Sequence, residues 1–397
     1  MKIDWNRKYT TIAVYAVLVV IASLVCYNVL HNFTSYKAAF RQLIGILLPV
    51  IYGFSIAFVL NPVERFFEKK IWGRISREKL SPKWNKGLSV FSTYIVAFLV
   101  IGIFLSVVIP QVTASIAGIV SNLSDYLGRV TGWLNSLFEM LPKEELFQKT
   151  LKKINESAQA ILEAFYSWLS ASLPMVLNAT KNLTTGLTNL ILGVIISIYF
   201  LFGKERFLAQ IKKALYALFP EDFVKRLVDV THTSNRIFSG FISGKLLDSL
   251  IIGILCFVGM SLFRMPMAML VSVIVGVTNV IPYFGPIIGA VPSALIVFLI
   301  DPIKALWFVF FVICLQQFDG NILGPRILGD SIGMPAFWVI FSILLFGGYF
   351  GVFGMFVGVP TFAVIYSIFK IWMEGRLERK NMPTDTKSYA SEEHPLL

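Results

Sequence analysis

The sequence predicts an all-α polytopic integral membrane protein with about eight membrane helices, including broken or re-entrant segments, and an extracytoplasmic amphipathic helical hairpin. Of its 397 residues, 56% are hydrophobic and 15% are charged, whereas soluble domains carry roughly 25% charged residues. The apolar residues form long runs that are separated by short basic segments. This pattern is typical of a chain whose helices are solvated by lipid.

Three apolar runs open the chain, and a helix needs roughly 20 apolar residues to cross the hydrocarbon. The runs cover Thr11–Leu30, Phe40–Asn61 and Leu88–Ile109. We expect the second and third helices to end at Pro62 and Pro110, because proline breaks the helical hydrogen-bond pattern. The loop 62–87 has many more Lys and Arg residues than acidic ones, which places it and the N-terminus in the cytoplasm. Residues 1–109 are therefore predicted to form an N-terminal group of membrane helices.

The segment 110–185 differs in character, because its acidic and basic residues balance and place it on the extracytoplasmic side. Its apolar residues recur at steps of three and four, and Pro110, Pro142 and Pro174 bracket two amphipathic helices. The stripe of the first helix consists of Ile116, Ile119, Leu123, Tyr126, Val130, Trp133 and Leu137. Each stripe must be buried on the other helix, on a neighbouring subunit or on the membrane surface. We expect a helical hairpin, because the apolar period stays near roughly 3.5 residues.

The chain then returns to the membrane and to the cytoplasm. A fourth span, Leu187–Phe202, leads into basic amphipathic helices that complete the segment 186–245. We interpret their positive charge as a solvated face near anionic lipid. The segment 246–373 contains several short or interrupted apolar runs, which predict a core with broken helices. The charged tail 374–397 is expected to be disordered in the cytoplasm.

One interruption of this core begins at Asn279 and contains Pro282, Gly285 and Pro286. Each proline removes a backbone donor, and Gly285 permits a reversed backbone. Pro286 suits the first position of the next half-helix, whose N-terminus would present a positive dipole end to a solute. Interrupted membrane helices often form the solute sites of secondary transporters. The alternative is a plain loop at the membrane surface.

A second interruption contains Gln317, Asp319, Asn321, Pro325 and Arg326. Ionisable residues at membrane depth are costly and usually functional, so Asp319 is the first candidate carboxylate. The alternative is a charge at a helix end that faces water and pairs with Arg326.

Two further charged residues, Lys245 and Asp248, lie near the start of the fifth span. Their i, i+3 spacing lets them pair on one helix face. Together with Asp319 they could couple an ion, or they could form a structural ion pair. Further along, Gly347, Gly348, Gly351 and Gly354 predict close helix packing or a flexible joint.

The sequence lacks the motifs of catalysis and of phosphate binding, since it contains no HExxH, GxSxG or GxxxxGK[ST] pattern. Its three histidines lie far apart, and its three cysteines fall separately in apolar runs without a CxxC pair. We therefore expect no enzyme activity, no metal site and no cofactor. The formal net charge of +12 follows from basic loops at the membrane, so nucleic acid is not expected as a partner.

Three stretches of the core resemble the signature motifs of the AI-2E (autoinducer-2 exporter) family of permeases. They are Asn279–Pro292 (NVIPYFGPIIGAVP), Gln316–Gly329 (QQFDGNILGPRILG) and Gly347–Pro360 (GGYFGVFGMFVGVP). The family more often has Glu at position 319 and His at position 334. Asp319 keeps a carboxylate at the first position, whereas Met334 lacks the titratable group at the second.

The resemblance implies a bacterial multi-pass permease of the cell membrane that forms a homo-oligomer and binds a small-molecule or ion substrate, with lipids around it. It also implies that 246–373 is a transport core. Some members look like exporters of autoinducer-2 and others like sodium/proton antiporters. Our leading hypothesis is a secondary transporter that exports a small polar solute past the interrupted helices. The alternatives are cation/proton exchange and a non-transporting membrane scaffold that uses 110–185 to bind a partner.

Overall fold

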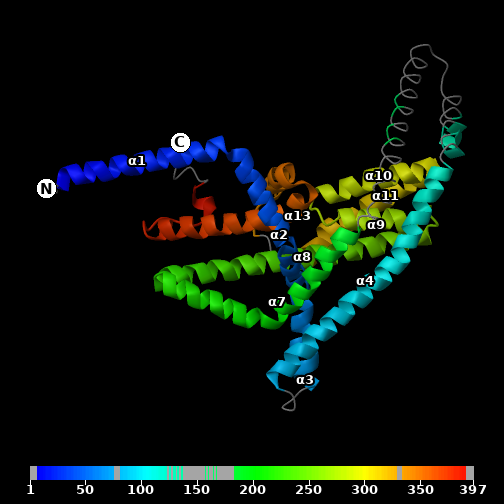
Figure 1. The fold of residues 1–397 in the computed structure, drawn as a ribbon. Helices are drawn as coiled ribbons and strands as arrows, with labels where there is room; N and C mark the ends of the chain where they lie inside the picture. The colour runs from blue at the N-terminus through cyan, green and yellow to red at the C-terminus, as the bar shows by residue number, and fades with distance from the viewer. Residues whose placement is uncertain are drawn as a thin grey trace, which may run out of the picture. The chain divides into compact units, whose positions relative to one another are not determined.

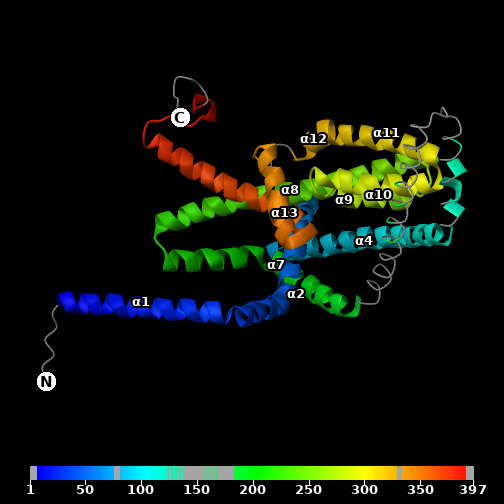
Figure 2. The same cartoon turned by 90° about the horizontal axis from the view of Figure 1, so that it is seen from above.

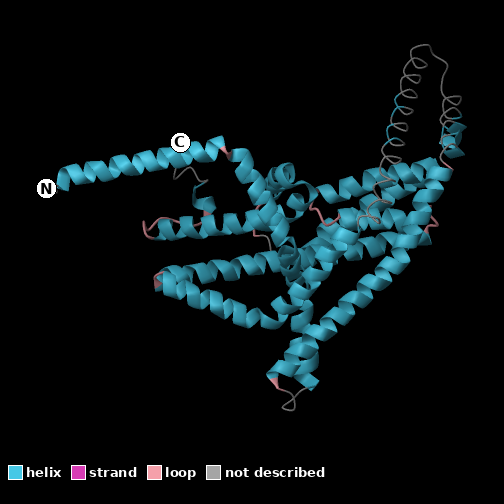
Figure 3. Ribbon diagram, in the orientation of Figure 1, coloured by secondary structure: helices cyan, strands magenta, loops and turns pink. Residues whose placement is uncertain are grey.

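The computed structural model describes residues 7–75, 81–122, 183–328 and 333–389, together with 125–126, 128–130, 132–133, 136, 157, 160, 164 and 167. The regular elements in this part of the chain are all helical (Figure 3). Six of the described helices are long and apolar enough to cross a membrane. Five of them correspond to α1 (Arg7–His31), α2 (Phe33–Phe66), α4 (Pro82–Ser121), α8 (Glu221–Leu262) and α13 (Ala336–Glu378), and the sixth is the 26-residue helical run Pro302–Ile327 that begins with α11 (Pro302–Phe318). With the shorter apolar helices α9 (Ala268–Thr278) and α10 (Phe284–Ile300), they confirm the predicted all-α polytopic class.

The chain forms two compact units. Unit 1 consists of residues 1–57 and 183–203, and unit 2 of residues 58–182 and 204–397. Within unit 1, α2 packs against the first part of α7 (Leu183–Leu218), which contains the fourth predicted span. A Cβ atom added to Gly53 would lie 2.6 Å from Ile196 Cγ2, and one added to Gly193 would lie 2.9 Å from Tyr52 Cβ. The two glycines therefore let these backbones approach closely.

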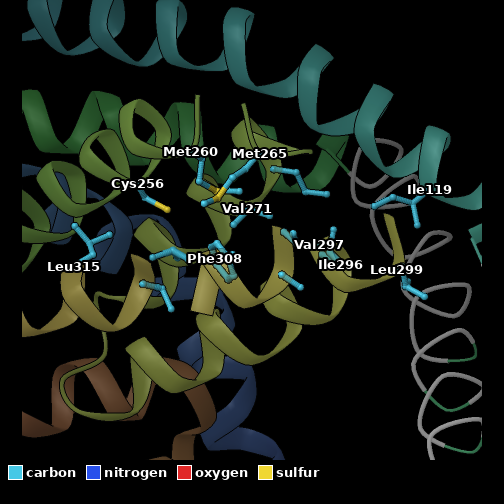
Figure 4. Close-up of a cluster of buried hydrophobic side chains, with 14 of the residues drawn as sticks. Ile119, Cys256, Met260, Met265, Val271, Ile296, Val297, Leu299, Phe308 and Leu315 are labelled. Carbon is cyan, nitrogen blue, oxygen red and sulfur yellow. The ribbon is translucent and has the colours of Figure 1, made fainter. Parts of the chain in front are cut away.

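At the centre of unit 2, α8, α9, α10 and α11 lie side by side (Figures 1 and 2). Their buried apolar side chains form one cluster, to which α8 contributes Cys256 and α11 contributes Phe308 (Figure 4). Two glycines let α8 and α9 approach closely, because a Cβ on Gly276 would lie 2.9 Å from the Cα of Gly253. These helices form the frame that holds the polar side chains described below.

Two of the predicted helix ends are wrong. Helix α4 continues through Pro110 to Ser121, and α2 continues past Pro62 into the π-helix η1 (Phe67–Trp72). A proline removes only one hydrogen bond, and neighbouring hydroxyl groups can satisfy freed backbone groups in membrane helices. Pro110 frees only the carbonyl of Ser106, one turn earlier, and α4 continues as a helix on both sides of it. The apolar sequence on both sides of each proline favours continuation of the helix.

The described residues of the first amphipathic stripe pack on the core of unit 2. Ile119 and Val130 are 1% and 0% exposed and belong to the apolar cluster of α8 to α11. The Trp133 ring meets the ring of Phe298 on α10 edge-on, with centroids 5.9 Å apart. None of the three expected burial modes includes this contact with the chain's own core. The stripe expected on the second helix lies outside the described residues, so the hairpin stays a prediction; it consists of Phe147, Leu151, Ile154, Ala158, Ile161, Phe165 and Trp168.

Helix α13 folds back on itself at Gly351, whose φ of 61° and ψ of −148° are not helical. Trp338 stacks on Phe362 with ring centroids 5.5 Å apart, although these positions would be about 36 Å apart in a straight helix. The glycine-rich stretch is thus a sharp joint rather than a gap between two spans. Beyond it, α13 continues to Glu378 and a 3-10 turn, η3 (Thr386–Tyr389), follows, so this part of the tail expected to be disordered has local structure.

Candidate functional site

The interruption predicted between the apolar runs of the core is present, and it forms the turn of a short helical hairpin. Helix α9 ends at Thr278 and α10 begins at Phe284. With 11 residues, α9 is about 16 Å long, roughly half the thickness of the hydrocarbon core. Helix α9 is therefore too short to cross the hydrocarbon by itself, which favours the interpretation of this segment as broken or re-entrant.

Glycine is required in this hairpin for close packing and not for a reversed backbone. The positive φ of the turn, 61°, falls on Tyr283, whereas Gly285 is helical. A Cβ on Gly285 would lie 2.0 Å from the carbonyl oxygen of Thr278, and one on Gly289 would lie 2.2 Å from Thr278 Oγ1. Pro286 is the third residue of α10 and not the first. The expected roles of Gly285 and Pro286 are therefore corrected: the tight contact between α9 and α10 selects glycine here.

At the tip of the hairpin, one amide joins two carboxylates from different helices. Asn279 Nδ2 donates to Asp248 Oδ2 at 3.2 Å and to Asp319 Oδ2 at 3.3 Å. Lys245 Nζ lies 2.7 Å from Asp248 Oδ2. Asp248 and Lys245 come from α8, and Asp319 begins the π-helix η2 (Asp319–Leu323) that follows α11. We call Lys245, Asp248, Asn279 and Asp319 the polar cluster.

The polar cluster is buried and its hydrogen-bonding capacity is only partly used. Asp248 and Asn279 are 0% exposed, and Lys245 and Asp319 are each 7% exposed. Asp248 Oδ1, Asn279 Oδ1 and Asp319 Oδ1 are buried and accept no hydrogen bond. Burial of a charge costs several kcal/mol unless it is compensated, and here one ammonium faces two carboxylates. The uncompensated groups are all oxygen acceptors, which suit a cation or a group rich in donors.

The π-helix η2 replaces the predicted second break. Helix α11 passes directly into η2 and then into α12 (Gly324–Leu328), so the chain stays helical through the polar stretch. Such π-helical segments are frequent at functional sites because they re-aim side chains. Here the wider turn coincides with Asp319, which is buried toward Asn279 rather than paired with Arg326, an exposed residue.

Several other predicted site residues lie outside the polar cluster. Gln317 and Asn321 are exposed and bond to each other, since Asn321 Nδ2 donates to Gln317 Oε1 at 2.9 Å. Pro325 is exposed as well, and Pro282 is buried in the turn between α9 and α10. The structure thus brings together the charged candidates and Asn279 but not the remaining polar ones.

A second group of charges, centred on the buried Glu64 and Lys86, was not anticipated from the sequence. Lys86 Nζ lies 2.9 Å from Glu64 Oε1, 3.0 Å from Glu205 Oε1 and 3.3 Å from Glu68 Oε1. Lys204 Nζ lies 3.5 Å from Glu64 Oε2, so the basic residues after the fourth span are not all on a solvated face. The Glu64 side chain is 0% exposed. An acidic residue directly after an apolar run was the signal that could have indicated this group.

These charges also act on Glu205, which follows the fourth span. Burial tends to raise the pKa of Glu205, but the hydrogen bond from Lys86 and the positive charges of Lys86 and Lys204 outweigh it and lower the pKa. The ion pairs of this group connect Glu64 at the end of α2 and Glu205 on α7 to Lys86 on α4.

Comparison with known proteins agrees with this architecture. The family model of the AI-2E family transporter matches residues 16–374. Three relatives carry the name "Putative transport protein". YueF of Bacillus subtilis is 27% identical over 352 residues, covering 86% of this chain and 89% of YueF. YhhT of Escherichia coli is 26% identical over 336 residues (83% and 84%), and sll0063 of Synechocystis sp. is 27% identical over 303 residues (75% and 71%).

The helical fold, the six membrane-length helices and the polar cluster within the helix bundle define a multi-pass membrane protein of the permease class. More narrowly, this chain belongs to the AI-2E transporter family. The resemblance carried by the three motifs of the core is thereby confirmed.

Proposed function

We propose that this protein is a secondary transporter that exports a small polar solute and couples its movement to a cation bound at the polar cluster. The observation that carries the proposal is the pair of buried carboxylates, Asp248 and Asp319, joined by Asn279 at the tip of a broken helix. The family name makes autoinducer-2 the first solute to test.

The geometry gives a physical reason for coupling. Asn279 bridges carboxylates on two helices that are far apart in the sequence, so the position of the hairpin depends on the charge of both. A proton on either carboxyl group would turn an acceptor into a donor. A metal cation would instead draw the free oxygens of Asp248, Asn279 and Asp319 toward one point. Either event changes the contacts that hold the hairpin tip, which is the requirement for a ligand to shift a conformational equilibrium.

Cation/proton exchange without a solute is the second candidate. It is favoured by the predominance of charged groups in the polar cluster, where three of four side chains are ionisable. The scaffold hypothesis loses support, because Ile119, Val130 and Trp133 of the segment meant to bind a partner are packed on the protein's own core.

The remaining proposals concern the setting of the protein. The Lys and Arg excess of the loop 62–87 supports a cell-membrane protein with both termini in the cytoplasm. Neither a cofactor nor an enzymatic activity is part of the proposal. We also propose a homo-oligomer surrounded by lipid, and cross-linking in native membranes tests it.

The experiment is flux from proteoliposomes that contain the purified protein and autoinducer-2, with and without sodium and pH gradients. Protein-free liposomes are the control. Efflux that a gradient accelerates is the expected result. Dissipation of a gradient without movement of autoinducer-2 would replace solute export by cation/proton exchange. No flux of either kind, from protein with an intact thermal unfolding transition, would contradict both candidates.

A further inference from the structure

The charge balance of the polar cluster depends on one residue, Lys245. Its side chain is 8% exposed and its Nζ lies 2.7 Å from Asp248 Oδ2. The same oxygen accepts from Asn279, so Asp248 Oδ2 has two donors while Asp248 Oδ1 has none. Asp319 receives a hydrogen bond from Asn279 but forms no ion pair among the described residues. With both carboxyl groups ionised, the cluster carries one net negative charge.

We propose that Lys245 is the residue that makes the polar cluster selective for monovalent over divalent cations. The inference rests on the proposed function in one respect, namely that the cluster binds a cation. The ligands would be the free oxygens of Asp248, Asn279 and Asp319, which are the acceptors that hard cations prefer. Lys245 is then a specificity-determining residue that contacts no ligand itself and acts through Asp248.

The argument is one of charge neutrality in a buried site. One monovalent cation brings the cluster, including Lys245, to zero net charge. A divalent cation leaves it with one positive charge, which is uncompensated and buried. Without the ammonium of Lys245 the balance reverses. The two carboxylates then neutralise a divalent cation, whereas a bound monovalent cation leaves one negative charge uncompensated.

Coulomb's law gives the scale of the effect. A unit charge about 4 Å from another contributes about a thousandfold in a binding constant at an effective dielectric constant near 20. Rearrangement of the site and partial solvation of the charges reduce this thousandfold effect, as does the cost of desolvating buried ions. We therefore expect removal of the ammonium to shift the preference from Na⁺ toward Ca²⁺ by roughly a hundredfold or more.

A purely structural ion pair makes a different prediction. If Lys245 only holds Asp248 in place, its replacement weakens the binding of every cation alike. The two readings are separated by the double variant Lys245→Gln/Asp248→Asn, which removes both partners of the ion pair and restores one net negative charge through Asp319. Charge selection predicts that the double variant prefers Na⁺ again, whereas a structural role predicts no such return.

The test is equilibrium binding of radiolabelled Na⁺ and Ca²⁺ to the purified full-length protein in detergent, at an alkaline pH that keeps carboxyl groups ionised. The wild type and Lys245→Arg are expected to bind Na⁺ and to discriminate against Ca²⁺. Lys245→Gln is expected to gain Ca²⁺ binding, and the double variant to lose it again. Lys225→Gln is the matched control, because Lys225 lies on the same helix and its side chain is 60% exposed.

Each outcome decides a separate point. If the wild type binds neither ion, the proposed cation site fails and this inference fails with it. If the wild type binds Na⁺ but Lys245→Gln keeps the wild-type preference, only the role of Lys245 is overturned. Should Lys245→Gln not fold, the wild type still decides, since equal binding of Ca²⁺ and Na⁺ with Lys245 in place would contradict the selection by charge.

Discussion

Substitution of Gly285 by alanine tests whether the tight α9–α10 hairpin positions Asn279. The added Cβ would lie 2.0 Å from the carbonyl oxygen of Thr278 and 3.0 Å from the Cα of Asn279. Both are backbone atoms, which cannot move aside as the end of a flexible side chain can. Relief therefore requires α10 to move from α9 by about 1 Å, and overpacking of this kind costs about 1–3 kcal/mol, occasionally more. The hydrogen bonds of Asn279 to Asp248 and Asp319, at 3.2 and 3.3 Å, are already long and would be lost.

The expected result for Gly285→Ala is a free energy of unfolding lower by about 3 kcal/mol and a Tm lower by roughly 5 °C. Transport in proteoliposomes should be lost as well. Thermal unfolding in detergent and flux are measured side by side with Gly102→Ala. Gly102 lies within α4 and has no heavy atom within 4 Å of an added Cβ, so its alanine variant should be as stable as the wild type or more so. A Gly285→Ala protein with wild-type Tm and wild-type flux would refute the reasoning.

Two further predictions concern the charges at α4 and the joint in α13. Lys86→Met should lower the free energy of unfolding by about 3 kcal/mol, because the fully buried Glu64 loses its nearest cation. Lys225→Met removes an exposed i, i+4 pair and should cost less than about 0.5 kcal/mol by the same unfolding measurement. Gly351→Ala should cost about 1–3 kcal/mol in thermal unfolding, since its φ of 61° and ψ of −148° are accessible almost only to glycine. Gly348→Ala, without steric neighbours or a positive φ, should change the Tm little, and equal effects of the two alanines would contradict the backbone explanation.

The part of the polar cluster that lies on one helix could be predicted from the sequence. Lys245 and Asp248 are three residues apart, and the helix brings them together at 2.7 Å as expected from that spacing. From the sequence, Asp319 and Asn279 could be proposed as site residues only because they are polar residues next to apolar runs. Their contact spans 40 positions of the sequence and depends on how the α9–α10 hairpin packs against α8 and α11, which no local pattern encodes.

The roles of glycine and proline in the backbone could also not be predicted fully from the local sequence. Local propensity favours glycine at a positive φ, yet the turn places it on Tyr283, while Gly285 is needed for close helix packing. In each case the tertiary contact overrides the local preference. Pro110 is a different case, because α4 continues through it, so a proline within a long apolar run does not mark the end of a helix. The position of Glu64 directly after an apolar run could have marked it as a candidate, but its partner Lys86 comes from another helix and could not be assigned from the sequence.

The central claim is that the buried carboxylates of the polar cluster bind the coupling cation, and the most direct measurement compares Asp319→Asn with Asp301→Asn. The Asp301 side chain is 36% exposed and caps α11, accepting from the backbone N–H groups of Ile303 and Lys304 at 3.1 Å, a role that Asn fulfils. Gradient-driven flux is recorded for both variants in proteoliposomes. The account predicts that Asp319→Asn abolishes the dependence on the sodium or pH gradient while Asp301→Asn retains it. Full gradient dependence in a folded Asp319→Asn protein would contradict the claim.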